Sequence, residues 1–296
     1  MGIINEAHQF DKNAIEIDMD APHSEIKSIV NLIRELVKLV KISIEVKYPW
    51  NEQKMKLMLD NIVQLFGYQT EQIEGIICLA ETNLCYYPSA FVISRTVIEI
   101  NILLEWLLDP EEENKRILRY IHYLKKQLAH IDIYKGCISE STLPIQDKNR
   151  CLEKENKINS HIREMTQVAE QYDVSPESIN DLTIRNFPSI MNKMVKEISP
   201  NERQNRLKLA YYSYSKFTHG MLPSIDRYNN PNFLSYVPVS EWHYPLLICY
   251  ESIIAFTQKL SKRFTVKSEE FDINLEPILV ELVEKMNKTF SPSSKD

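Results

Sequence analysis

Apolar residues recur every three or four positions along most of the chain, which is the period of an α-helix, whereas the alternation typical of β-strands is nearly absent. The clearest example lies in residues 26–40, where seven apolar side chains would share one helical face. Ser24 is a suitable N-cap for this helix, and Pro49 marks its end. The pattern therefore predicts an all-α protein built as a helical bundle.

Further apolar stripes of the same period predict the rest of the bundle, and Pro or Gly residues mark where many of the segments begin or end. We expect Gly67 to end or bend the second helix, and residues 136–147 to form a loop. The predicted segments are 51–66, 70–83, 90–108, 110–134, 148–172, 200–219, 241–264 and 275–290, with short helices after Pro176 and Pro188.

The chain of 296 residues is 44% hydrophobic, which is enough apolar surface for one large domain. The segment 148–172 is strongly charged and is expected to be an exposed arm, and 221–240 is the longest irregular stretch. The predicted organisation is a flexible segment at 1–21, one helical domain at 22–290 with its core in 51–134 and 200–264, and a disordered tail at 291–296.

The most apolar segment, 90–108, approaches the length of a membrane-spanning helix. It carries Arg95, Glu99 and Glu105, and three charges are costly in a bilayer. A helix buried in a globular core fits better, so we expect no membrane association. The first 20 residues lack the basic and apolar regions of a signal peptide, which predicts a cytoplasmic protein.

Composition excludes several classes of ligand site. Only 5 residues are Gly, and they are scattered, so neither a P-loop nor a dinucleotide-binding loop can be built. The five cysteines form no zinc-binding spacing and are expected to be reduced thiols, and we predict neither a metal nor a cofactor. The net charge of −6, with acids matching the basic residues of 148–163, favours a solvated arm or a partner surface over a nucleic-acid groove.

Arg95 and Glu99 lie four residues apart and would share one face of the apolar helix. So many of their neighbours are apolar that we expect both charges to be buried, at a cost of several kcal/mol of hydration each. Two readings follow: an ion pair that braces neighbouring helices, or a polar pocket that needs both groups for a ligand.

A second group lies in the helix that ends near Gly220. Tyr211, Ser215 and His219 recur every four residues and form a strip of two hydroxyls and one imidazole. Ser215 and His219 point outward in similar directions, which disfavours a nucleophile–base pair. Near a helix C-terminus the imidazolium form of His219 is favoured, and it could donate to Glu99 or to a phosphate; a partly buried polar helix is the alternative.

Arg116 and His122 satisfy an R-x(4–6)-H spacing. Such a pair on a helix could bind a phosphate and move a proton while a ribose 2′-hydroxyl attacks, which is metal-independent RNA cleavage. Arg119 with Tyr120 and His122 is an alternative grouping, and a solvated helix face is the third.

Residues 68–125 and 211–219 resemble an uncharacterised bacterial family of all-helical domains with R-[ST]-x-x-E and Y-x-x-x-S-x-x-x-H motifs. That family looks like a distant relative of HEPN domains, which implies a helical effector that cleaves RNA without a metal or binds a nucleotide or a partner. In one respect the chain differs, because Ile117 follows Arg116 where HEPN nucleases have a polar residue.

Two functions are therefore predicted. The first is a HEPN-like effector of bacterium–phage conflict that acts on RNA or a nucleotide. The second is a non-catalytic factor, either a defence-complex subunit or a phage-encoded inhibitor, that assembles on a protein partner; a homo-oligomer is expected in either case. The candidate catalytic residues are Arg116, His122, His219 and Glu99, and the candidate ligand-binding residues are Arg95, Ser215, Tyr211 and Arg119.

Overall fold

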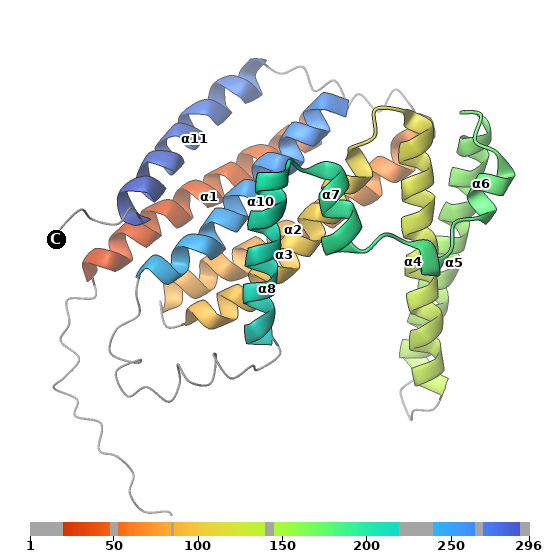
Figure 1. The fold of residues 1–296 in the computed structure, drawn as a ribbon, viewed down its shortest axis with the longest axis horizontal. Helices are drawn as coiled ribbons and strands as arrows, with labels where there is room; N and C mark the ends of the chain where they lie inside the picture. Colours follow the sequence, from red (N-terminus) through yellow and green to blue (C-terminus); the bar gives the residue numbers. More distant parts are fainter. Residues whose placement is uncertain are drawn as a thin grey trace, which may run out of the picture.

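A computed structural model describes residues 20–47, 53–83, 86–139, 145–218, 239–263 and 269–290 (Figure 1). Residues 1–19 of the predicted flexible segment, the predicted tail and most of the irregular stretch 221–240 lie outside these residues, as does His219. The long helices are α1 (Asp20–Lys47), α2 (Gln53–Thr82), α3 (Tyr87–Leu108), α4 (Glu113–Ser139), α5 (Ile145–Glu170), α8 (Asn201–Thr218), α10 (His243–Arg263) and α11 (Glu269–Phe290).

Short helical turns connect α5 to α8 and precede α10. They are α6 (Pro176–Asn180), η3 (Ile184–Asn186), η4 (Ile190–Met194), α7 (Val195–Ile198) and η5 (Val239–Trp242). The part of the chain that the structure describes contains no β-strand, so the predicted all-α bundle is confirmed. Within the same part, no helix combines the length and the apolar character that crossing a membrane requires.

The sequence predicted that Gly67 ends or bends the second helix, but α2 continues through this residue. Gly67 lies in the middle of one 30-residue helix. Its carbonyl accepts a hydrogen bond of 2.7 Å from the Thr70 hydroxyl, and the buried Gln69 amide donates to the carbonyl of Val97 on α3 at 3.2 Å. A helical glycine costs only about 1 kcal/mol relative to alanine. Burial of Phe66 beside it, at 1% exposure, outweighs that cost.

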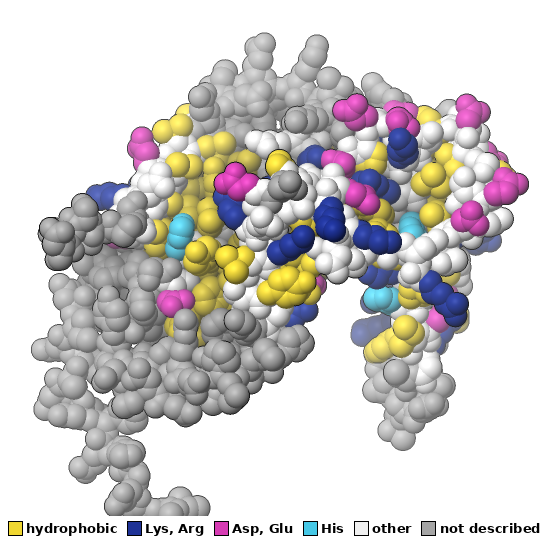
Figure 2. Space-filling view, in the orientation of Figure 1, with side chains coloured by type: hydrophobic (Ala, Val, Ile, Leu, Met, Phe, Trp, Pro, Cys, Tyr) yellow, Lys and Arg dark blue, Asp and Glu magenta, His cyan; other side chains and the backbone are white. Residues whose placement is uncertain are grey.

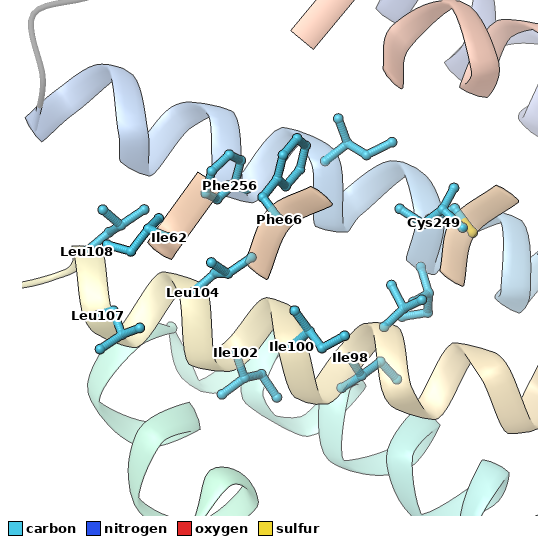
Figure 3. Packing of buried hydrophobic residues seen from close by; sticks show 14 of the residues in the cluster. Ile62, Phe66, Ile98, Ile100, Ile102, Leu104, Leu107, Leu108, Cys249 and Phe256 are labelled. Atoms are coloured by element: carbon cyan, nitrogen blue, oxygen red, sulfur yellow. The ribbon is translucent and has the colours of Figure 1, made fainter. Parts of the chain in front are cut away.

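The centre of the bundle is α3, which contacts α2, α10, α8 and the short turns before α8. Figure 3 shows Leu104 and Ile100 directed toward α2 and α10, while Ile102 points to the opposite side of the helix. Across from them, Phe66 and Phe256 stack with ring centroids 4.1 Å apart. The prediction of a buried apolar helix in this segment is confirmed, because α3 is covered on more than one side.

The pair α4 and α5 projects from the body of the bundle (Figure 1). The predicted loop at 136–147 is too long, since α4 continues through Gly136 to Ser139 and α5 begins at Ile145. The charged segment is also less exposed than predicted: Met165 and Ala169 of α5 are fully buried. Figure 2 shows the molecule hollowed between this arm and the part of the body that carries α8.

Candidate functional site

Three residues of the two predicted motifs meet in space. The Arg95 Nη2 atom on α3 donates to the Tyr211 hydroxyl on α8 at 3.0 Å, across 116 residues of sequence. The Arg95 Nε atom donates to Glu99 Oε1 at 3.2 Å. The guanidinium also lies over the Tyr211 ring, 4.9 Å from its centroid. We call Arg95, Glu99 and Tyr211 the α3–α8 cluster.

The expectation that Arg95 and Glu99 are both buried is wrong. Their side chains keep 22% and 34% of their surface exposed. The reason lies in the helix geometry: Ser94, Val97 and Ile98 take the fully buried directions of α3, which leaves the two charged residues at the margin of the contact with α8. A ligand can therefore reach part of the cluster.

The charges of the cluster favour an ionised arginine and a protonated phenol. Burial by itself lowers the pKa of Arg95, but the hydrogen bond to Tyr211 and the charge of Glu99 more than offset this, so the pKa is raised. Burial, followed by the charge of Glu99, raises the pKa of Tyr211. At neutral pH the cluster therefore presents a cation and a neutral hydroxyl.

Sequence reasoning missed a third charged group, Lys126 on α4. Burial lowers its pKa, and the nearby charge of Glu99 partly compensates. Its Nζ atom lies over the ring of Phe187, 4.3 Å from the centroid. Lys126 follows His122 by one helical turn, but only the packing of α4 near α3 relates it to Glu99. With Lys126 included, two cations face one carboxylate, which leaves a net positive charge.

Ser215 lies one turn after Tyr211 on α8 and is half-buried. Its hydroxyl donates to the carbonyl of Tyr211 at 2.7 Å, a bond within the helix. Its proton is thus already used, although its oxygen can still accept a bond.

Arg116 stabilises the turn between α3 and α4. Its side chain is 5% exposed, and its Nη1 atom donates to the carbonyls of Pro110 at 2.8 Å and Glu111 at 3.2 Å. These bonds satisfy carbonyl groups that precede α4. A guanidinium buried in this way supports the local fold, and the phosphate-binding role predicted for Arg116 has no accessible geometry here.

His122 and Arg119 connect α4 to other segments. The His122 Nε2 atom bonds the carbonyl of Thr183 at 2.7 Å, and the imidazole is 6% exposed. Arg119 donates to the carbonyl of Trp106 at 2.6 Å and to Glu197 at 2.8 Å. The predicted catalytic grouping is therefore not brought together: Arg116, Arg119 and His122 each bond to a different part of the chain.

Among the residues that the structure describes, the most buried carboxylate of an ion pair is Glu105, and its pairing was not indicated by the sequence. Arg203 of α8 makes two bonds, of 2.6 and 2.7 Å, to the Glu105 carboxylate, which is 1% exposed. Asn101 donates to the same carboxylate at 2.7 Å. The 98 residues between Glu105 and Arg203 explain why spacing gave no signal.

No group of three or more His, Cys, Asp or Glu side chains with metal-binding geometry occurs among the residues that the structure describes.

Comparison with models of protein families assigns the chain to a family. A family model described as "Family of unknown function (DUF5677)" matches residues 59–233, more than half of the sequence. The chain belongs to this family. The prediction of an uncharacterised helical family is confirmed, and the match to DUF5677 spans the α3–α8 cluster, whereas the likeness to HEPN domains stays a prediction. No curated protein and no solved structure matches the chain significantly.

Proposed function

We propose that this DUF5677 member is a HEPN-like effector of bacterium–phage conflict that binds a phosphate group of a nucleotide or RNA at the α3–α8 cluster. The observation that carries the proposal is the 3.0 Å bond between the partly exposed Arg95 and Tyr211, two motif residues from distant helices. The conflict setting rests on the resemblance to HEPN domains.

Arginine suits this role because its planar guanidinium can make paired, charge-assisted hydrogen bonds to a phosphate. Glu99 bonds the Nε edge of Arg95, which fixes the orientation of the guanidinium. Burial and the charge of Glu99 raise the pKa of Tyr211, which keeps its hydroxyl protonated at neutral pH. Partial burial strengthens such bonds relative to those made in bulk water.

Binding is better supported than cleavage through Arg116 and His122. Each of these side chains is at most 6% exposed and bonds a backbone carbonyl. If the protein cleaves RNA, the proposal assigns the proton transfer to the partly exposed Glu99, with His219 as the remaining imidazole candidate.

The test isolates the protein from bacterial cells that express it and measures released nucleotide and total-RNA integrity at matched soluble levels. We expect nucleotide or RNA to co-purify with the native protein and to be lost from Tyr211→Phe, which removes one hydroxyl. Tyr212→Phe is the matched control, because Tyr212 is 54% exposed and lies beside Tyr211.

RNA breakdown that disappears in Glu99→Gln would extend the proposal to cleavage at this cluster. Absence of bound nucleotide from the native protein, together with intact RNA, would contradict the proposal. If soluble His122→Ala loses RNA breakdown while Tyr211→Phe keeps full activity, the catalytic site lies on α4 and not at the α3–α8 cluster.

A second candidate function, assembly into a homo-oligomer, is supported by an apolar cavity of about 370 Å³ between α8 and α10. Leu209 and Tyr244 line it and are 67% and 54% exposed. Exposed apolar side chains around a concavity are typical of interfaces.

Light scattering over a range of concentrations tests this second candidate. We expect a dimer or larger assembly that Leu209→Glu dissociates. The control is Ile133→Glu on α4, since Ile133 is 64% exposed and lies away from this cavity. A native protein that stays monomeric at all concentrations would exclude the interface.

A further inference from the structure

A second site lies on the projecting arm, in a groove between α4 and α5 that we call the arm groove. Its volume is about 590 Å³, within the usual range for ligand sites. It shares no lining residue with the α3–α8 cluster. Its polar and aromatic lining residues are Asn61, Tyr123, Gln127, His130, Tyr134, Arg150, Lys154, Lys157 and His161.

The cationic residues of the groove form one row. Arg150, Lys154 and Lys157 follow the i, i+4, i+7 spacing of a single α5 face, and His161 continues it. The three cations from Arg150 to Lys157 span seven residues of helix, or about 10 Å. At about 3.4 Å per phosphate along a helical strand, this length corresponds to about three consecutive phosphates.

Most acids of this segment do not line the groove, although Glu153 lies one helical turn from both Arg150 and Lys157. None of the described lining residues is Asp or Glu. Glu155 of α5 is ion-paired with Lys135 of α4 and does not line the groove. Lys154 and Lys157 have no hydrogen bond or ion pair within the described ranges and are exposed. The described lining of this face is therefore cationic, although acids and bases are balanced along the segment as a whole.

Aromatic rings face the cationic row from α4. Tyr134 is 54% exposed at the groove, and Tyr123 is half-buried along its wall. Figure 2 shows histidine and Lys or Arg side chains next to one another on the arm. Burial and the charge of Lys157 lower the pKa of His161, so it is neutral at neutral pH and the row carries three positive charges.

We propose that the arm groove binds a single-stranded polynucleotide, with its phosphates along Arg150, Lys154 and Lys157 and a base stacked on Tyr134. Cations that follow a backbone beside exposed aromatic rings are the two features that single-strand binding uses. The proposal goes beyond the function proposed for the α3–α8 cluster, because it concerns a separate site whose binding can be measured without any effect on cells.

The test measures fluorescence anisotropy of labelled single-stranded RNA and DNA of about ten nucleotides with the full-length protein. For three neutralised phosphates, the logarithm of the binding constant should fall with the logarithm of salt concentration with a slope of about −2. In Lys154→Ala/Lys157→Ala the slope should fall to about −0.7, with binding weakened on the order of fifty-fold at about 50 mM salt.

The matched control is Lys38→Ala/Lys41→Ala, which removes the same charge from exposed positions of α1, a helix with no extensive contact to α4 or α5. It should keep the native slope. Tyr134→Leu should weaken binding by roughly five- to hundred-fold without changing the slope, since stacking is lost and no charge is removed. Circular dichroism confirms that each variant is folded.

Preference for RNA or for DNA identifies the source of the strand, and either one supports the groove. Equal affinity for a mononucleotide and for the strand would overturn the proposal, as would no binding or a salt slope unaffected by the lysine substitutions. Loss of strand binding in Tyr211→Phe, with the arm variants unaffected, would transfer the strand to the α3–α8 cluster.

Discussion

Replacing either partner of the buried Arg203–Glu105 pair should destabilise the protein, but by unequal amounts. Arg203→Ala leaves a carboxylate that is 1% exposed, with Asn101 as its remaining donor within the described part of the chain. Removal of one partner of a buried pair costs about 3–5 kcal/mol. Glu105→Gln instead leaves a guanidinium that is 21% exposed and borders a cavity of about 330 Å³, where it can reach water.

We therefore expect Arg203→Ala to lower the free energy of unfolding by about 3–5 kcal/mol. Glu105→Gln should lower it by about 1–3 kcal/mol, because the glutamine still accepts one hydrogen bond. Urea unfolding followed by circular dichroism gives both free energies. In a thermal scan the first change corresponds to a fall in Tm of about 6–10 °C for a chain of this size. The double substitution Arg203→Met/Glu105→Leu should recover most of the loss, since apolar residues often replace a buried pair without cost.

Equal costs for the two single changes, or a larger cost for Glu105→Gln, would refute this reasoning. Either result would mean that the carboxylate finds solvent or another donor when Arg203 is removed. The site between α3 and α8 would then be less closely packed than the two short bonds indicate.

Three further predictions concern the core and α4. Burial raises the pKa of the Tyr214 phenol above its usual value of about 10, so the free energy of unfolding should fall as pH rises above about 10; urea unfolding should show a smaller fall in Tyr214→Phe. Phe256→Ala should cost about 3–5 kcal/mol by calorimetry, because the ring is fully buried. Arg119→Met should cost about 1–3 kcal/mol and shift Trp106 fluorescence to longer wavelength, since it loses its bonds to Trp106 and Glu197.

The helices could be predicted from the sequence because their apolar period is strong. The segment at 90–108 was predicted as a buried helix and forms α3 (Tyr87–Leu108). The predicted break at Gly67 was wrong, because tertiary packing of α2 on α3 outweighs the weak helix propensity of one glycine. The local sequence pattern therefore predicts where helices form, but not that two predicted segments join into the single helix α2.

The candidate site could be predicted only within each helix. Spacing placed Arg95 near Glu99 and Tyr211 near Ser215, and both relations are present in the structure. The bond from Arg95 to Tyr211 crosses 116 residues and depends on how α8 crosses α3, which no local pattern encodes. For the same reason the pairing of Glu105 with a residue of α8 was not foreseen.

Residues on α4 illustrate the opposite error. Arg116 and His122 have the spacing of an RNA-cleaving pair, but i and i+6 positions face different directions on a helix. Each side chain therefore contacts a different connection, Pro110 in one case and Thr183 in the other. The spacing of Arg116 and His122 predicted a catalytic pair, but both side chains instead stabilise the surrounding turns through bonds to backbone carbonyls.

The central claim is that the α3–α8 cluster holds a phosphate of a nucleotide or RNA. Its most direct test is ultraviolet cross-linking followed by peptide mapping. Protein isolated from irradiated cells would be digested and its nucleotide-linked peptides identified by mass spectrometry. The account predicts a cross-linked peptide of α8 that contains Tyr211, and its loss in Arg95→Gln but not in Tyr212→Phe. Nucleotide linked to other peptides alone, with the α8 peptide unmodified in the native protein, would contradict it.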